Sequence, residues 1–385
     1  MSSISRLVLT DFRSYPALDL AFEPGLVALS GENGAGKTNL IEAISFLCPG
    51  RGLRRAELGE CARFGSSGRW SIFAEVATAE GPRQLGVGAE AQLDSSYARR
   101  YRLDREPVAS LKPFAEIVRI VWLTPSMDGL FAGPAGERRR FLDRLVLAVD
   151  AEHGTRVNAL ERALRNRNRL LEENAERRWL DAAESEVAEL AIAVAAARVE
   201  TVQHLVARIA AAREEASAFP HAELSLQGDV ERLIGNRPAI EIEDAYRAML
   251  RENRSRDAAA GRTLIGPQAT DLLVRHGPKQ ADAARSSTGE QKALLVGLVL
   301  AHARLVAEVS GITPILLLDE IAAHLDAARR EALFETLIAL RAQVFMTGAD
   351  AAVFAELKGR AQMLQVAAGR VSAAWPPGAE HRRGL

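Results

Sequence analysis

Residues 31–40 read GENGAGKTNL, and they match the pattern G-x-x-x-x-G-K-[ST] at Gly31, Gly36, Lys37 and Thr38. The backbone N–H groups of such a loop cradle phosphates, and the helix that follows adds the positive end of its dipole. Lys37 would bridge the β and γ phosphates and Thr38 would ligate Mg²⁺. The residues that we expect to contact nucleotide here are Gly31, Glu32, Asn33, Gly34, Ala35, Gly36, Lys37, Thr38 and Asn39.

The segments on both sides of the loop have the structure that this motif needs. An apolar run with strand character, GLVALS (25–30), leads into it, and helical spacing of Leu40, Ile41, Ile44 and Leu47 follows. The alternative, a chance match of eight residues, does not explain this strand–loop–helix context. We therefore interpret the loop as a nucleotide site and expect ATP and Mg²⁺ as its cofactors.

A second motif, PILLLDEIAAHLD (314–326), places two acids directly after an apolar strand. Burying charge is costly unless the charge is paired or bound to a metal. Asp319 suits a direct or indirect Mg²⁺ role, and Glu320 suits the base that orients and polarises an attacking water. The alternative is that both acids cap the next helix, but the phosphate loop independently requires such a partner.

The bulk composition excludes several classes of protein. The 385 residues carry a net charge of −1, so any nucleic-acid site must be a local basic patch. The two cysteines, Cys48 and Cys61, form no C-x-x-C, which argues against a disulfide framework or a zinc site. We find no N-terminal apolar leader and no run of about 18 apolar residues. We therefore expect a cytoplasmic protein with no membrane partner.

Patterns along the chain predict a mixed α/β organisation. Strands are predicted at 4–10 and 118–124 and in the segments RWSIFAEVAT, RQLGVGAE, YARRYRLD, RTLIG, DLLVRHG, PILLLD, QVFMTG and QMLQVAAGRV. Residues 155–218 hold almost only helix formers and predict one long helix, or two packed as a hairpin. The early strands fit an antiparallel sheet, and the last part fits a parallel sheet with crossover helices.

A third motif, SSTGEQKALL (286–295), is a Ser/Gly turn that opens a helix. Alone it is a weak signal, because a simple N-cap at Ser287 or Thr288 would look the same. With the other two motifs it resembles the L-S-G-G-Q signature loop of ABC-type ATPases, with Ser287 as the serine, Thr288 and Gly289 as the glycine pair, and Glu290 as the glutamine. The resemblance implies that Ser287 and Gly289 contact a γ-phosphate bound by a second subunit, so that the hydrolytic site is complete only in a dimer.

The whole chain resembles the RecF family of bacterial recombinational repair proteins. The gap of about 250 residues between Lys37 and Ser287 exceeds that of transporter subunits and lacks the long coiled coil of the SMC and Rad50 type. The matching segments run in the expected order: TDFRSY, GRGLRRAELGECARFG, RRFLD at 139–143, TLIGPQATDLLV, STGEQK and LLLDEIAAHLD.

This resemblance implies an α/β fold of the ABC type. We expect a Rad50-head-like P-loop ATPase head, with a parallel core sheet and an antiparallel β side sheet. A helical lobe would be inserted between the phosphate loop and the signature motif. We place the N-terminal part of the head at 1–125, the helical insertion lobe at 126–262 and the C-terminal part of the head at 263–385.

The resemblance also implies a function in DNA replication and repair. RecF-like proteins bind DNA at single-strand/double-strand gaps and act with RecR and RecO to load RecA in recombinational repair and the SOS response. We expect an ATP-dependent homodimer with slow, DNA-stimulated hydrolysis. Two alternatives stay open: an ABC transporter ATPase subunit, and a nucleotide-gated DNA scaffold in which hydrolysis is functionally minor.

Several single residues carry expectations of their own. Thr347, in VFMTGAD, stands where transporters have the switch histidine, and its hydroxyl carries no positive charge, which favours slow hydrolysis. Asp326 fits the D-loop, and Arg13 matches an arginine that lies near the phosphates in Rad50-like heads, although a surface salt bridge is the alternative. The family pattern G-P-H-R departs here to Gln268 and Ala269, so any role of those polar residues is in doubt.

Clustered arginines are the candidates for DNA phosphate contacts. We expect sequence-independent, salt-sensitive binding, because no helix-turn-helix, zinc finger or aromatic RNA platform is visible. For each cluster alone a solvated charged face is the alternative, and the first cluster is the one that we favour. The clusters are Arg51, Arg54 and Arg55, then Arg138, Arg139 and Arg140, then Arg165, Arg167 and Arg169.

Overall fold

The computed structural model describes residues 2–92, 96–212, 219–235, 237–322 and 325–373. The chain divides into two compact units: unit 1 comprises Met1–Asp128 and Val306–Leu385, and unit 2 comprises Gly129–Leu305. We predicted 263–305 as part of the C-terminal head, and that domain division stays a prediction; in the structure this segment lies in unit 2. The physical reason is that the strand at Asp271–His276 pairs with the strand at Ala222–Gln227.

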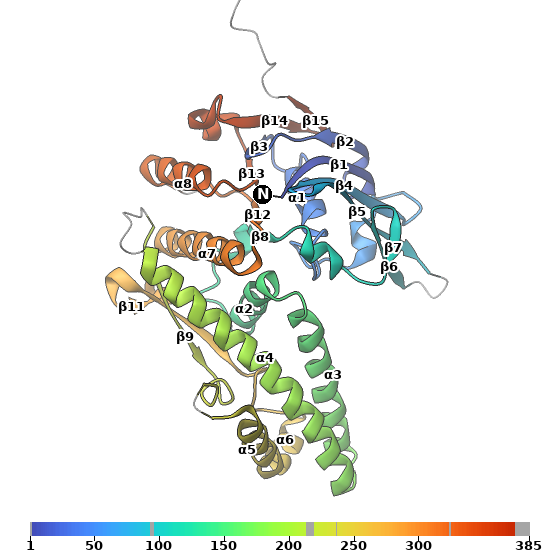
Figure 1. Cartoon of the computed structure of the whole chain (residues 1–385), viewed down its shortest axis with the longest axis vertical. Coiled ribbons are helices and arrows are strands. Elements are labelled where there is room, and N and C mark those ends of the chain that lie inside the picture. Colours follow the sequence, from blue (N-terminus) through green and yellow to red (C-terminus); the bar gives the residue numbers. More distant parts are fainter. Residues whose placement is uncertain (1, 93–95, 213–218, 236, 323–324, 374–385) are drawn as a thin grey trace, which may run out of the picture. The chain divides into compact units, whose positions relative to one another are not determined.

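A mostly parallel sheet forms one layer of unit 1 (Figure 1). Its strands, in spatial order, are β15 (Arg370–Ala373), β14 (Ala361–Ala367), β3 (Leu26–Ser30), β13 (Val344–Gly348), β12 (Ile315–Leu318) and β8 (Ile120–Leu123). Neighbours from β14 to β8 run parallel, and only β15 is antiparallel to its partner. All residues of β3, β8, β12 and β13 are buried, which explains why these strands are continuous apolar runs.

An antiparallel sheet forms the second layer of unit 1. Its order is β2 (Tyr15–Ala21), β1 (Ser3–Phe12), β4 (Trp70–Thr78), β5 (Gly81–Ala91), β6 (Tyr97–Leu103) and β7 (Glu106–Val108). One hydrophobic core joins both sheets and includes Leu40, Ile41 and Ile44 of helix α1 (Lys37–Ser45). Helix α8 (Ala327–Ala339) follows β12. The parallel core sheet and antiparallel side sheet that the sequence predicted are thus confirmed.

Short 3₁₀ helices complete unit 1 and recur in unit 2. They are η1 (Leu58–Cys61), η2 (Pro113–Glu116), η3 (Pro125–Met127), η4 (Gly277–Lys279), η5 (Ala283–Arg285) and η6 (Ala351–Leu357).

Unit 2 is mostly helical and carries one small sheet. Its helices are α2 (Ala135–Val149), α3 (His153–Glu172), α4 (Arg177–Ala212), α5 (Ala239–Glu252) and α6 (Arg254–Ala260), and α7 (Thr288–Ser310) begins here and runs past residue 305. The sheet order is β11 (Ala281–Asp282), β10 (Asp271–His276) and β9 (Ala222–Gln227). The expected helical stretch from 155 is two helices, α3 and α4, that pack on each other, and residues 213–218 lie outside the described residues.

The strand predicted in RTLIG (262–266) was wrong: these residues are irregular. Polar contacts replace ladder hydrogen bonds there. The Leu264 N–H donates to Asp257 Oδ1 at 3.0 Å, and the Thr263 hydroxyl donates to Asn168 Oδ1 at 2.8 Å. The apolar residues of this segment therefore support an irregular connection between α6 and β10.

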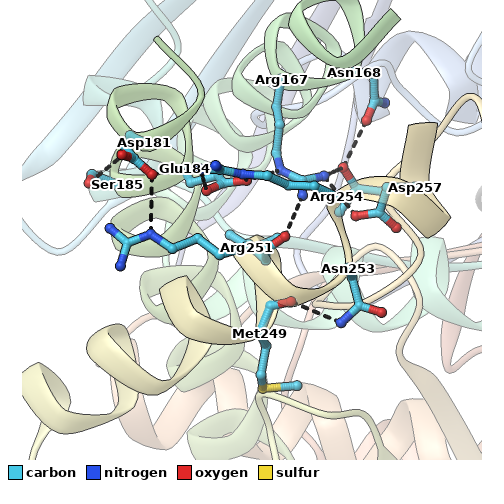
Figure 2. A network of polar contacts seen from close by, with 12 residues as sticks. Arg167, Asn168, Asp181, Glu184, Ser185, Met249, Arg251, Asn253, Arg254 and Asp257 are labelled. Carbon is cyan, nitrogen blue, oxygen red and sulfur yellow. Dashed lines mark hydrogen bonds and ion pairs between the residues drawn. The ribbon is translucent and has the colours of Figure 1, made fainter. Parts of the chain in front are cut away.

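A buried ion network lies among the helices of unit 2 (Figure 2). The Arg167 guanidinium is fully buried and donates to Asp257 Oδ2 at 2.8 Å and to Glu184 Oε1 at 3.2 Å. It also donates to the Leu250 carbonyl and the Thr263 hydroxyl, both at 2.8 Å. Arg167 thus connects α3 to α4, α5 and α6, so that it fixes these helices by directional bonds as well as by apolar packing.

Two helices, α4 and α7, are long and apolar enough to cross a membrane by length and composition alone. Both bury much of that apolar surface inside the protein, for example Val187 and Ala191 in α4 and Leu294 and Leu298 in α7. Core helices of this kind satisfy the same test of length and hydropathy, so the two helices carry little weight as evidence for a membrane.

Candidate nucleotide site

The phosphate loop connects β3 to α1 in unit 1, as its sequence context predicted. Gly31, Gly34 and Gly36 have φ values of 149°, 83° and 116°. A Cβ on Gly31 would lie 2.1 Å from the Val366 carbonyl oxygen, and one on Gly36 would lie 2.9 Å from the Tyr15 hydroxyl. Glycine is therefore required by its backbone conformation and also by the close approach of β14 and the β1–β2 turn.

Lys37 opens α1 and is buried against the loop. Its Nζ donates to the Gly31 carbonyl at 2.6 Å and to the Glu32 carbonyl at 2.9 Å. Burial lowers the pKa of Lys37, and the nearby carboxylates of Glu320 and Asp319 oppose that shift. The ammonium group therefore lies at the mouth of the loop with carbonyl partners, which phosphate oxygens can replace.

Hydrogen bonds through two hydroxyl groups connect the two acids after β12 to α1. The Thr38 hydroxyl donates to Asp319 Oδ1 at 3.0 Å, and the Thr347 hydroxyl donates to the same oxygen at 2.7 Å. The Thr347 oxygen in turn accepts the Glu320 backbone N–H at 2.8 Å. Thr38, Asp319, Glu320 and Thr347, which lie far apart in the sequence, are thus brought to one edge of the parallel sheet.

The backbone explains this convergence. In the parallel register Leu318 of β12 pairs with Leu123 of β8 and Met346 of β13, so the residues that follow these strands share one edge. Glu320 has φ of 47°, in the left-handed region that side chains adopt at a cost. Strained residues of this kind gather at functional sites, and here the Thr347 hydrogen bond holds the Glu320 backbone.

Two hydroxyl residues at this edge were missed by the sequence analysis. Thr124 follows β8 and is buried, and its hydroxyl lies 2.9 Å from that of Ser126. The Asp319 N–H donates to the Leu123 carbonyl at 2.9 Å, which fixes β8 next to the acids. The signal was available, because Thr124 directly follows the buried strand IVWL, as Asp319 directly follows ILLL.

Arg13 contacts the helix of the phosphate loop through Glu42. Its guanidinium forms two hydrogen bonds to the buried Glu42 carboxylate, at 2.9 and 2.8 Å. Arg54 shares that carboxylate at 3.1 Å and donates to Asn39 Oδ1 at 2.8 Å. The Asn39 amide donates to the Ser14 hydroxyl at 2.9 Å. Both arginines are therefore oriented toward α1 in this structure.

The other two arginines of the favoured DNA cluster lie elsewhere on the same segment. Arg51 is largely exposed and lies 3.7 Å from the Glu57 carboxylate. Arg55 has φ of 58°. Contacts of Arg51, Arg54 and Arg55 with DNA stay a prediction.

The signature motif forms the N-terminus of α7 in unit 2. The Ser287 hydroxyl accepts the Glu290 N–H at 3.4 Å, and the Glu290 carboxylate accepts the Ser287 N–H at 3.0 Å, which is a capping box. Lys279, at 2.7 Å, and the Ser287 N–H lower the pKa of Glu290 to about 2. A Cβ added to Gly289 would meet no atom within 4 Å. The start of α7 is thus a pre-formed, capped turn.

Asp326 begins α8. Its carboxylate accepts the Arg329 N–H at 2.8 Å and caps the helix. Residues 323–324 of the same motif lie outside the described residues. Asp326 thus has the N-cap role that any helix start favours, and a role in nucleotide binding stays a prediction.

The residues at the sheet edge fit Mg²⁺ and a triphosphate. Thr38 and Asp319 offer a hydroxyl and a carboxylate oxygen 3.0 Å apart, and hard cations prefer such oxygen ligands. Among the described residues, no group of three or more His, Cys, Asp or Glu side chains could hold a metal alone.

Comparisons with known proteins agree with this geometry. The family model described as the RecF/RecN/SMC N-terminal domain matches residues 3–372. The DNA replication and repair protein RecF of Mesorhizobium japonicum is 52% identical over 369 residues, which cover 96% of this chain and 97% of that protein. RecF of Agrobacterium fabrum is 52% identical over 373 residues, with coverage of 96% and 98%.

Solved structures share the fold. A structure of the recombination mediator protein RecF-ATPrS in the RecFOR pathway superposes with a TM-score of 0.85 at 20% identity, and covers 97% of this chain and 98% of that one. An Smc head bound to the C-winged helix domain of ScpA gives a TM-score of 0.53 at 15% identity, with 96% coverage of both chains. These likenesses, together with the family model, confirm the SMC-like fold of the head. The chain has the phosphate loop, the acids after β12 and relatives that are 52% identical over nearly its full length. It therefore belongs to the RecF family of DNA replication and repair proteins.

Proposed function

We propose that this protein is an ATP-dependent dimer that binds DNA at single-strand/double-strand gaps and hydrolyses ATP slowly. By family it would act in the cytoplasm with RecO and RecR to help load RecA in recombinational repair and the SOS response. The observation that carries the proposal is the hydroxyl chain Thr38–Asp319–Thr347–Glu320, which connects the phosphate loop to the candidate base. The 52% identity to a RecF protein, over 96% of this chain and 97% of that protein, argues against the transporter-subunit alternative.

Each residue of the site has a defined part in this proposal. Lys37 and the loop N–H groups would bind the β and γ phosphates, and Thr38 and Asp319 would hold Mg²⁺, which neutralises phosphate charge when bound. Glu320 would accept a proton from the attacking water. Thr347 would position Glu320 and offers no positive charge to the transition state, which supports slow turnover.

The signature loop would complete the site from a second copy of the chain. Ser287 and Gly289 lie at the N-terminus of a 23-residue helix, where N–H groups and the helix dipole favour an anion. The capping box keeps this turn formed without the partner. ATP would therefore join two heads, and DNA would bind to the ATP-bound dimer.

Sedimentation in Mg²⁺-ATP, with and without gapped duplex, tests this proposal. We expect a dimer in the parent protein and monomers in Lys37→Arg and Ser287→Arg. Ser372→Arg, at an exposed position of β15, is the matched control and should still form a dimer. A parent protein that stays monomeric with ATP and DNA would contradict the shared site.

A scaffold with functionally minor hydrolysis remains the second candidate, supported by the uncharged Thr347 at the switch position. A Glu320→Gln protein that still loads RecA at the parent rate would favour it. Loss of RecA loading together with loss of hydrolysis would favour the first candidate, in which loading needs ATP hydrolysis.

A further inference from the structure

The segment between α1 and β4 ends in a turn that carries a fully exposed aromatic ring. Phe64 is 100% exposed, whereas the other exposed large apolar side chains among the described residues lie between 39% and 61%. Single exposed apolar residues are common in soluble proteins. Phe64 differs from them through the rigidity of its turn and the charge of its segment.

Hydrogen bonds hold the turn on both sides of the ring. The Ser66 N–H donates to the Arg63 carbonyl at 3.1 Å, and Gly65 has φ of 75°, which is typical of a type II turn with Phe64 at the second position. The Arg63 N–H donates to the Asp11 carbonyl at 2.8 Å, and its side chain donates to Asp11 Oδ1 at 2.6 Å. These hydrogen bonds fix the turn, so that the exposed Phe64 side chain extends from an ordered backbone.

The segment is basic and adjoins a basic strand. Residues 50–69 contain five arginines and two glutamates. The Glu57 carboxylate lies near Arg51, and that of Glu60 accepts the Glu57 N–H, so both acids have partners within the segment. A Cβ on Gly59 would lie 2.8 Å from the ring of Tyr97 in β6, and one on Gly68 would lie 3.0 Å from the Tyr97 hydroxyl oxygen. The same strand carries Arg99, Arg100 and Arg102.

The segment is also attached to the nucleotide helix. Arg54 donates to Asn39 Oδ1 and Glu42 Oε2 in α1. Arg99 donates to the carbonyls of Gly50 and Phe46 at 2.8 and 2.7 Å, where the segment leaves α1. A ligand held by this segment would thus be connected through direct contacts to the helix that starts at Lys37.

We propose that Phe64 stacks on an unpaired base at the single-strand side of a DNA junction. Arg69 and the other arginines of residues 50–69 and of β6 would contact the phosphates. An aromatic ring beside arginines is the arrangement by which proteins bind single strands without reading sequence. A base pair inside a continuous duplex is stacked on both faces and leaves no free face for such a ring, so Phe64 would distinguish a gap from continuous duplex. This inference deepens the proposed DNA binding and rests on it.

The test measures binding to gapped duplex and to a closed circular duplex without ends, in Mg²⁺ with a non-hydrolysable ATP analogue. Phe64→Ala should weaken gap binding about tenfold or more and leave binding to the closed duplex unchanged. Phe64→Trp should restore gap binding. Trp179→Ala, which removes another exposed aromatic ring, on α4, is the matched control and should bind as the parent does. Unchanged Tm values would show that both variants are folded.

Two further readouts separate stacking from charge. A 2-aminopurine at the first unpaired position should be quenched by the parent protein and by Phe64→Trp, but not by Phe64→Ala. Phe64→Ala should keep the salt dependence of binding, whereas Arg69→Ala should reduce the slope of log K against log salt by about one.

The outcomes distinguish this inference from the proposed function. If the parent protein binds no DNA, the proposed function fails. If the parent prefers gaps and Phe64→Ala binds them equally well, with equal quenching, the stacking role is overturned while DNA binding stands. Normal gap binding by Phe64→Ala, together with lost binding to RecR or RecO, would also overturn it and assign the ring to a protein partner.

Discussion

Two buried polar clusters of this protein hold their charges in different ways. In unit 2, the Arg167 guanidinium meets the carboxylates of Asp257 and Glu184 directly, and Arg254 adds a second guanidinium to Glu184 (Figure 2). In unit 1, Asp319 is buried but bonds to the hydroxyls of Thr38 and Thr347, and Lys37 bonds to carbonyls.

The difference separates a structural network from a binding site. Once two charges are paired inside the protein, breaking the pair leaves an uncompensated buried ion. In the nucleotide cluster the hydrogen-bond partners of Lys37 and Asp319 are neutral carbonyl and hydroxyl groups, so a charged ligand and its metal can take those places. We therefore expect substitutions in the Arg167 network to act on stability, and substitutions in the nucleotide cluster to act on function.

The largest effect on stability is expected from Arg167→Met. The variant buries Asp257 and Glu184 without their shared partner, which costs about 3–5 kcal/mol of unfolding free energy. Arg251→Met is the control, because Arg251 is exposed and its contact with Asp181 contributes about 1 kcal/mol or less. Urea unfolding measures both. Equal costs for the two variants would contradict the structural role of the network.

Glu320→Gln should show the opposite behaviour. The amide keeps the shape of the side chain and its backbone bond to Thr347, but it cannot accept a proton. We expect ATP hydrolysis to fall about 10²–10⁴-fold, with ATP binding and unfolding free energy nearly unchanged. Glu335→Gln, on the exposed side of α8, controls for the charge change. A loss of ATP binding equal to the loss of hydrolysis would contradict the role of a base.

The sequence predicted the nucleotide cluster because each part is local. The loop GENGAGKTNL and the acids after ILLL are short patterns, and parallel strands bring their ends to one edge. The details were not local. That Thr347 holds both Asp319 and the Glu320 backbone depends on a register that the sequence does not display. Thr124 was missed because a hydroxyl after a strand is a weaker signal than a carboxylate.

The Arg167 network shows the other limit. Arg165, Arg167 and Arg169 alternate in the sequence, and they looked like one solvated face. In the helix, positions two apart lie about 200° around the axis, so Arg167 faces inward while Arg165 and Arg169 are exposed. Helical periodicity could have indicated this. Its partner Asp257 lies 90 residues away, and no sequence pattern connects the two.

A third buried polar group, His302, differs from both the Arg167 network and the nucleotide cluster, because burial keeps its imidazole neutral. Burial lowers its pKa to about 4, the Leu145 carbonyl opposes this through a bond from Nε2 at 2.9 Å, and Arg144 adds to the lowering. The unfolded chain binds the proton near pH 6.5, so stability is full above that pH and falls as pH drops through 6.5 toward 4.

Between pH 7.5 and pH 5.5 the parent protein should therefore lose about 1 kcal/mol more unfolding free energy than the His302→Gln variant does. The glutamine amide can still donate to the Leu145 carbonyl but does not titrate in this range. Urea unfolding at both pH values gives the two slopes. The same pH dependence in both proteins would assign it to other groups.

A smaller effect on hydrolysis than that of Glu320→Gln is expected from Thr347→Val, which removes one hydroxyl at nearly constant volume. Asp319 then loses one donor and the Glu320 N–H loses its acceptor, so hydrolysis should fall about tenfold, a loss of about 1.4 kcal/mol that lies within the range for two such hydrogen bonds. Thr347→Ser keeps the hydroxyl and should retain most of the activity. A matched removal at Thr336, which bonds only within α8, should leave hydrolysis unchanged. If Thr347→Val lowers stability as much as Arg167→Met does, the two clusters do not differ in kind and the distinction between network and site fails.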